Sequence, residues 1–428
     1  MNIDRKTFLR GLGLGALGAF AAPNLLAQSA ADAATSLPAY DPANAAAYWR
    51  AVRAQYPIDP QLHYMNTGGL GPAANPVLRV LTDQIHAHQV ACDTGHPLFH
   101  EARKVVAGFF AVEPSEICFT RNATEGTSII AAGLTLREGD EVIFETHAHP
   151  GGSFPWYNQQ NRRGVVVKLF EPDPTSVEGN LDRIRALITP RTKVIQISHV
   201  TAPTGILLPA AEVARLAHEH GAWFHIDGAQ SAGMFPFRLH DLGCDSFATS
   251  GHKWLGAPHE TGILFIRHER NDEVAPVCIG AYSGELPYLP GKLVLTPDAT
   301  RHEYATRSAA TVMSVAAAVQ FHAAIGHDRI AAHGRALAVQ LHETLAKIPD
   351  VEVLTPTRPE LRASMTTFRS SRIGYSELFG KLWGQHHFRC RPVSEQKLNA
   401  VRVSTHLFNS AEECERLAAA VHDLVRHA

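Results

Sequence analysis

The chain has 428 residues, of which 45% are hydrophobic and 19% charged, a composition typical of globular proteins with a sizeable core. Its 39 basic and 41 acidic residues leave a formal net charge of −2, which gives no electrostatic reason to expect a nucleic-acid or acidic-membrane partner. The sequence also lacks low-complexity tracts and runs of like charge, which excludes disordered, collagen-like and coiled-coil proteins.

The first segment, residues 1–33, has the features of an export signal. Basic Arg5 and Lys6 precede a Gly/Ala/Leu-rich stretch, and small residues after Pro23 offer cleavage points. The stretch is too short and too rich in glycine to cross a bilayer as a stable helix. The run DRKTFL resembles the twin-arginine export consensus, with Lys6 in place of the second arginine. We therefore expect the export machinery to bind this segment and the mature protein to be periplasmic.

Residues 34–60 are expected to form an N-terminal extension that packs on a small domain. In residues 61–308, short apolar runs alternate with helical stretches, which predicts a large α/β domain with a mostly parallel sheet covered by helices. One such helix ends at Gly221 and places Val213, Leu216 and Ala217 on one face. The strands are predicted at residues 116–120, 141–146, 165–170, 193–200, 222–227, 246–250 and 262–267.

The alternation of short apolar runs and helical stretches ends after residue 308. An alanine-rich helix is predicted over about 309–325, followed by a second helical stretch and by strands around 351–369 and 388–404. A final helix begins at Ala411. Residues 309–428 therefore predict a smaller α+β domain.

Two residues in the central stretch carry the strongest chemical signal. Asp227 closes an apolar strand, and Lys253 follows the next strand directly, in the run Ser-Gly-His-Lys. Polar residues at the carboxyl ends of strands in an open α/β sheet face the ligand site. Pyridoxal phosphate chemistry needs this pair: the lysine bonds to the cofactor aldehyde as an aldimine, and the carboxylate keeps the ring nitrogen protonated. A solvated lysine and a turn-capping aspartate are the structural alternative.

These residues belong to two motifs, Asp-Gly-Ala-Gln (227–230) and Ser-Gly-His-Lys (250–253). Both resemble the class V aminotransferase family of fold-type I pyridoxal phosphate enzymes over about residues 60–425. The resemblance implies a homodimer with shared active sites, Lys253 and Asp227 as catalytic residues, Gln230 on the 3-hydroxyl oxygen of the cofactor, and Ser250 and His252 on its phosphate.

Further cofactor contacts follow from the same resemblance. Ala123 and Thr124, at a predicted helix start, would hold the phosphate, which agrees with the affinity of helix N-termini for anions. His149, a third expected catalytic residue, would stack on the pyridine ring. Thr306, in the run Glu-Tyr-Ala-Thr-Arg where the family has glycine in place of Ala305, would reach the phosphate of the partner subunit.

Substrate contacts are expected at two residues. Arg402 matches the arginine that binds the substrate carboxylate, for which its planar guanidinium is suited. A strand-edge surface arginine is the alternative. Asn66 lies in a segment that resembles the one lining the substrate entrance in the family.

Histidine and cysteine patterns point away from metal and disulfide proteins. His147 and His149 form a pair that could ligate a metal, but no neighbouring acidic or thiol ligand accompanies them, so no metal site is expected. The six cysteines show no CxxC and no framework spacing.

The choice of reaction remains open within this family. A cysteine desulfurase needs a thiolate on a mobile loop, and Cys390 lies instead in an expected strand. The segment around Thr201–Gly205 resembles the isopenicillin N epimerase-like branch, and the export signal adds a resemblance to a periplasmic enzyme that tailors pyoverdine. We expect an aminotransferase-type reaction on an amino acid or peptide-borne amino group. Epimerisation and C–S lyase or desulfurase chemistry are the alternatives, and a non-catalytic binding protein is a further one.

Overall fold

The central sheet consists of the seven strands that the sequence predicts. The computed structural model describes residues 37–286 and 288–428, so the predicted export signal lies outside the described residues. The strands are β2 (Ile117–Thr120), β3 (Glu141–Glu145), β4 (Val166–Phe170), β5 (Thr192–Ser198), β6 (Trp223–Asp227), β7 (Ser246–Ser250) and β8 (Gly262–Ile266).

Their order is β2-β8-β7-β6-β5-β3-β4. Strand β8 is antiparallel to both of its neighbours, and the other strand pairs are parallel. The predicted α/β fold with a mostly parallel sheet is confirmed.

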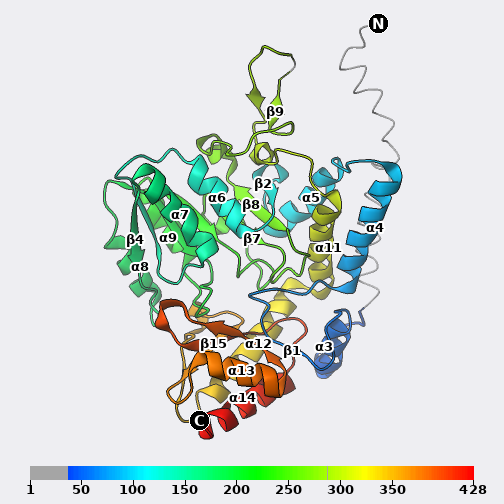
Figure 1. Ribbon diagram of the computed structural model, residues 1–428, viewed down its shortest axis with the longest axis vertical. Coiled ribbons are helices and arrows are strands. Elements are labelled where there is room, and N and C mark those ends of the chain that lie inside the picture. The colour runs from blue at the N-terminus through cyan, green and yellow to red at the C-terminus, as the bar shows by residue number, and fades with distance from the viewer. Residues whose placement is uncertain (1–36, 287) are drawn as a thin grey trace.

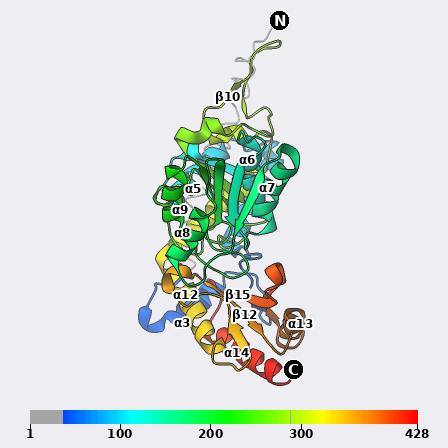
Figure 2. The ribbon, with the colours of Figure 1, turned by 90° about the vertical axis from the view of Figure 1, so that its left-hand side faces the viewer.

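Helices cover both faces of this sheet (Figure 2). The α-helices between residues 75 and 242 are α4 (Asn75–Ala91), α5 (Leu98–Phe110), α6 (Ala123–Gly133), α7 (Pro150–Arg163), α8 (Val177–Arg185), α9 (Ala210–Glu219) and α10 (Leu239–Leu242).

Alternate strand residues belong to two different cores. Val142 and Phe144 pack with Trp156 of α7, whereas Ile143 packs in the cluster that contains Val213 of α9. Successive side chains of a strand point to opposite faces, so strands buried on both sides read as continuous apolar runs.

A second unit, the C-terminal unit, lies below the central sheet in Figure 1. Its antiparallel sheet has the order β11-β12-β15-β14 and its own apolar core, which includes Leu341, Phe368 and Val401. The elements are α12 (His327–Leu345), β11 (Val351–Val353), β12 (Met365–Ser370), α13 (Tyr375–His386), β13 (Phe388–Arg389), β14 (Arg391–Val393), β15 (Ala400–Ser404) and α14 (Ala411–Arg426).

Helix α11 (Ala309–Ile325) joins the two units. It packs on α4 and α5, and its buried residues Val312, Met313 and Phe321 belong to the same core cluster as the central sheet. The predicted division at residue 309 assigns this helix to the small domain, and the predicted domain limits remain a prediction. Within the described residues no single helix is long and apolar enough to span a membrane; α11 and α12 meet that test of length and composition together, but bent by 78°.

The N-terminal segment crosses to the C-terminal unit. In α3 (Ala45–Arg53), the Trp49 ring stacks on His333 of α12 with centroids 3.8 Å apart. The following strand β1 (His63–Tyr64) pairs in parallel with β13. These contacts carry the chain to residues 66–71, which lie at the site described next.

At the opposite end of the molecule, β9 (Gly284–Glu285) and β10 (Val294–Leu295) form a hairpin that projects away from the central sheet (Figure 1). Tyr288 and Leu289 near its tip are 72% and 82% exposed.

Candidate active site

A cavity of about 310 Å³ lies where the carboxyl ends of β6 and β7 meet the start of α6. In parallel α/β sheets this edge is where ligands bind, because the strands all end there and the connecting loops surround it. Nine of the residues predicted from the sequence line this cavity, namely Ala123, Thr124, His149, Asp227, Gln230, Ser250, His252, Lys253 and Arg402.

Asp227 is held at the floor of the cavity. It ends β6 and is buried, with Oδ1 accepting a hydrogen bond from the Ala229 amide at 3.0 Å. A Cβ on Gly152 would come within 2.5 Å of Oδ2. Glycine at 152 therefore leaves room for that oxygen, and Asp227 itself lines the cavity.

Lys253 faces the same cavity from the loop after β7. Burial lowers the pKa of its amine to about 8, although the Asp227 carboxylate opposes this shift. The Gly71 amide donates to the His252 carbonyl at 2.7 Å, and a Cβ on Gly71 would lie 1.7 Å from the Lys253 carbonyl oxygen. Gly71 thus packs directly against the backbone of Lys253, and a residue with a side chain would not fit at position 71.

The start of α6 forms the third side of the cavity. Asn122 caps this helix, with Oδ1 accepting from the Glu125 amide at 2.9 Å. The Ala123 amide donates to Ser250 Oγ at 2.9 Å, and the nearby buried Nδ1 of His252 has no hydrogen-bond partner among the described residues. A helix N-terminus beside an unpaired imidazole nitrogen suits a phosphate group.

His149 and Gln230 complete the lining. His149 caps α7, with Nδ1 accepting from the Gly151 amide at 3.0 Å. Desolvation and the charge of Lys253 lower its pKa, which favours a neutral ring. The Gln230 amide is held at both ends, because Nε2 donates to the Gly68 carbonyl and Oε1 accepts from Trp254 Nε1, each at 2.8 Å.

Arg402 enters from the C-terminal unit. It is 1% exposed, and its Nη1 donates to the Ala202 carbonyl at 2.7 Å while Nη2 donates to Asn66 Oδ1 at 3.0 Å. Asn66 therefore orients the arginine and is not among the residues that line the cavity. The predicted role of each residue toward substrate or cofactor stays a prediction.

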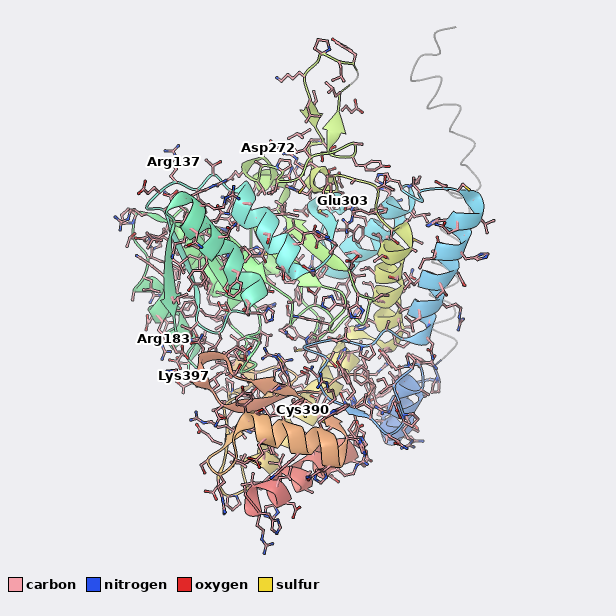
Figure 3. All side chains as sticks on the ribbon, viewed as in Figure 1. Arg137, Arg183, Asp272, Glu303, Cys390 and Lys397 are labelled. Carbon is pink, nitrogen blue, oxygen red and sulfur yellow. The ribbon has the colours of Figure 1, made fainter. Side chains whose placement is uncertain are left out.

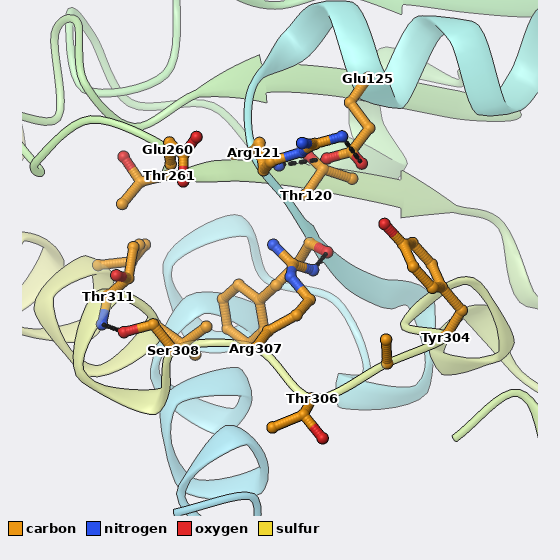
Figure 4. A pocket seen from close by; sticks show the side chains of 15 residues that line it. Thr120, Arg121, Glu125, Glu260, Thr261, Tyr304, Thr306, Arg307, Ser308 and Thr311 are labelled. Carbon is orange, nitrogen blue, oxygen red and sulfur yellow. Dashed lines mark hydrogen bonds and ion pairs between the residues drawn. The ribbon is translucent and has the colours of Figure 1, made fainter. Parts of the chain in front are cut away.

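Thr306 is not brought to this cavity. It lines a separate hollow with Arg121, Glu125, Tyr304 and Arg307 (Figure 4). Arg307 Nη1 donates to the Phe119 carbonyl in that hollow, and Arg121 pairs with Glu125. The contact predicted for Thr306 involves a partner subunit, so within a single chain it stays a prediction.

Two residues in or near the site, Arg391 and Glu145, were not recognised as such in the sequence analysis. Arg391, on β14, lines the cavity, and only the pairing of β14 with β15 places it there. Glu145 ends β3, is fully buried, and accepts from the Ser198 amide at 3.1 Å. Burial raises its pKa to about 7, and the Asp227 carboxylate adds to the shift. A carboxylate closing an apolar strand was the available signal for Glu145, as it was for Asp227.

The thiol of Cys390 and the ring of His147 do not line the cavity. Cys390 is fully buried in the C-terminal unit (Figure 3), and burial raises the pKa of its thiol to about 12. His147 contacts Thr204 Oγ1 at 2.9 Å and Glu171 Oε1 at 3.1 Å. Among the described residues no group of three or more His, Cys, Asp or Glu side chains is placed to hold a metal ion.

The cavity residues fit pyridoxal 5'-phosphate. They present an amine for the aldehyde, a carboxylate for the ring nitrogen, and a helix start with an unpaired imidazole nitrogen for the phosphate. Lys253, Asp227 and His252 supply these three groups from the ends of adjacent strands.

Comparisons with known proteins agree with this donor set. Residues 86–417 match the family model described as aminotransferase class-V. The chain is 30% identical to isopenicillin N epimerase of Amycolatopsis lactamdurans over 88% of this chain and 98% of that one. It is 26% identical to a probable cysteine desulfurase of Methanothermobacter thermautotrophicus, over 87% and 97%. A solved C-DES variant with glycine covalently linked to its PLP cofactor superposes with a TM-score of 0.78, at 25% identity over 87% and 99%.

Proposed function

Since this chain belongs to the class V aminotransferase family and its cofactor is pyridoxal 5'-phosphate, we propose that it catalyses an aminotransferase-type reaction. The substrate is an amino acid or the amino group of a peptide-borne amino acid. The observation that carries the proposal is the amine of Lys253, with its pKa lowered to about 8, in one cavity with the Asp227 carboxylate.

When bound, pyridoxal phosphate supplies an aldehyde that condenses with amines and a ring that withdraws electrons from the carbon beside the amine. Lys253 Nζ, in its neutral form, would take the proton from that carbon and, for amino transfer, would deliver it to the carbon that was the aldehyde of the cofactor. The Asp227 carboxylate holds a proton on the ring nitrogen. Arg402 binds the substrate carboxylate and orients the reacting carbon, since both of its Nη atoms are tethered.

Epimerisation is the second candidate. The relative at 30% identity is named isopenicillin N epimerase, and return of the proton to the same carbon from the other side is the step that distinguishes the two reactions. Desulfuration is less well supported, because attack on sulfur needs an accessible thiolate and Cys390 is buried with a raised thiol pKa.

We also propose that the protein acts in the periplasm and that it is a homodimer. The basic and apolar pattern of residues 1–33 supports export and a periplasmic site of action. A homodimer in which Thr306 reaches the partner's phosphate site is supported by the family resemblance. The resemblance to a pyoverdine-tailoring enzyme adds siderophore peptides to the substrates worth testing.

The test is a visible spectrum of the purified protein during incubation with a panel of amino acids and peptides, followed by addition of an α-keto acid. Transamination predicts loss of the cofactor band on adding one amine and its return with the keto acid. Appearance of the opposite enantiomer on a chiral column, without loss of the band, would support epimerisation instead. Lys253→Ala should abolish either reaction, and a wild-type protein that binds no cofactor would overturn the proposal.

A further inference from the structure

The cavity contains a second arginine whose position no part of the proposed reaction explains. Arg391 on β14 and Arg402 on β15 are direct partners in the antiparallel register. Directly opposed residues share a face of the sheet with Cβ atoms about 5 Å apart, and like charges in that arrangement are destabilising. Two guanidinium groups held in this way favour a bound anion between or beside them.

The two guanidinium groups lie in different surroundings. Arg402 is 1% exposed and tied to the Ala202 carbonyl and to Asn66. The Arg391 side chain is 21% exposed, and its Nη2 donates to the Glu395 carboxylate. Arg402 is therefore the more deeply buried of the two arginines, and Arg391 is the one that solvent reaches.

Each arginine keeps one buried donor unused. Among the described residues, neither Arg391 Nη1 nor Arg402 Nε has a hydrogen-bond partner. Buried donors that stay unpaired cost free energy, so both are suited to acceptors that arrive with a ligand. Glu395 occupies only one edge of the Arg391 fork, which leaves Nη1 free to donate to a carboxylate oxygen.

We propose that Arg391 binds a second carboxylate of the substrate and so makes this site specific for amino compounds that carry two carboxylates. Arg402 binds the carboxylate beside the reacting carbon, and Arg391, the more exposed of the two, binds the distal one. This inference rests on the proposed function, because it concerns the substrate of the same cavity. The substrate class is therefore a free acidic amino acid, or a peptide that keeps one carboxylate beside the reacting carbon and a second one within reach of Arg391.

The test compares dicarboxylates with monocarboxylates of equal length by calorimetric titration of the cofactor-loaded protein. The probes are succinate, glutarate and adipate against butyrate, valerate and hexanoate. Because these acids carry no amino group, their binding is measured without turnover. A failure of the aminotransferase proposal would therefore leave this measurement interpretable.

We expect at least one dicarboxylate to bind about tenfold or more tightly than its matched monocarboxylate, the range for a charge-assisted hydrogen bond. Arg391→Met should bring this ratio of dissociation constants close to one, and Arg391→Lys should restore part of it. The matched control is Arg389→Met, because the Arg389 guanidinium lies 5.5 Å from the ring of Phe379 and 5.4 Å from that of Trp383. It should keep the wild-type ratio.

Two results would overturn the inference. A wild-type protein that binds both classes of acid equally would mean that Arg391 recognises no second carboxylate. An Arg391→Met variant that weakens both classes by the same factor would mean that the two arginines share one carboxylate. The visible cofactor band and the melting temperature of each variant separate these results from a loss of folding.

Discussion

Arg103 on α5 and Glu303, three residues before Thr306, form a buried two-point ion pair. Arg103 Nη1 lies 2.8 Å from Glu303 Oε1, and Nη2 lies 2.9 Å from Oε2. Glu303 Oε1 also accepts from the Phe119 amide of β2 at 2.7 Å. The pair thus ties a helix and an edge strand of the central sheet to the segment that carries Thr306.

Removing one member of this pair should be costly. Arg103→Met leaves the Glu303 carboxylate buried beside a single amide donor, and we expect the free energy of unfolding to fall by about 3–5 kcal/mol. The measurement is urea denaturation followed by circular dichroism. The double variant Arg103→Met/Glu303→Met should lose less than the single one, because no charge stays unpaired. Equal losses in the two variants would contradict this account.

The lowered pKa of Lys253 predicts the pH dependence of cofactor loading. Only the neutral amine attacks an aldehyde, and burial holds the pKa of Lys253 at about 8, so the rate of loading of the apoprotein should rise with pH and reach half its maximum near pH 8. Stopped-flow absorbance with pyridoxal 5'-phosphate measures this rate. Asp227 raises the pKa of Lys253, so in Asp227→Asn the midpoint should shift to lower pH. A midpoint near that of free lysine would refute the assignment.

The raised pKa of Glu145 predicts that the folded chain loses stability as pH rises. Its pKa is raised to about 7 in the folded chain against 4.5 in the reference state, so between these values the unfolded chain loses a proton that the folded chain keeps. The free energy of unfolding should fall across this window by a few kcal/mol. Glu145→Gln retains an acceptor for the Ser198 amide and should remove this fall.

Glu141, at the other end of β3, is the matched control for Glu145. Although burial opposes it, hydrogen bonds from Lys168, Thr189 and Arg191 lower the pKa of Glu141 to about 2. Glu141→Gln should therefore lower stability at neutral pH and should lose less relative to wild type in acid. Urea midpoints at pH 3, 5 and 8 distinguish the two behaviours, because the contribution of Glu141 changes between pH 4.5 and 2 and that of Glu145 between pH 4.5 and 7. If the stability of both variants depends on pH in the same way, the opposite pKa shifts assigned to Glu141 and Glu145 are wrong.

Buried histidines near α11 and α12 predict sensitivity to acid. Burial lowers the pKa of His406 to about 3 and of His333 to about 4, and that of His322 lies well below its usual value. Below about pH 6.5 the unfolded chain binds protons that the folded chain does not, so each histidine costs about 1.4 kcal/mol per pH unit until its folded pKa is reached.

His322→Phe tests this dependence. Neither ring nitrogen of His322 has a hydrogen-bond partner among the described residues, so the phenylalanine variant loses no such bond. We expect its melting temperature to fall less than that of wild type between pH 7 and pH 5. Parallel curves would show that His322 does not contribute to the acid sensitivity.

Most of the central sheet could be predicted because its signals are local. Each predicted run from 116–120 to 262–267 overlaps one strand of the sheet, since strands buried on both faces are continuously apolar and bounded by turns. Asp227 and Lys253 were found for a related reason: a charged residue directly after such a run has few structural explanations.

Residues whose place depends on pairing between distant segments could not be found this way. Arg391 faces Arg402 only because β14 pairs with β15 in one register, and a shift by one residue would turn its side chain to the other face. Asn66 meets Arg402 because β1 pairs with β13, from the other end of the chain.

The α/β class, the seven sheet strands and the residues that match the cofactor motifs could be predicted from the amino-acid sequence, because hydrophobic periodicity and polar residues at strand ends are properties of neighbouring residues. The three-dimensional fold was needed to show that α11 packs with the central sheet, that Cys390 is buried, and that two arginines share the cavity. Those features depend on contacts between residues far apart in the chain, whose geometry is set when the two units pack together.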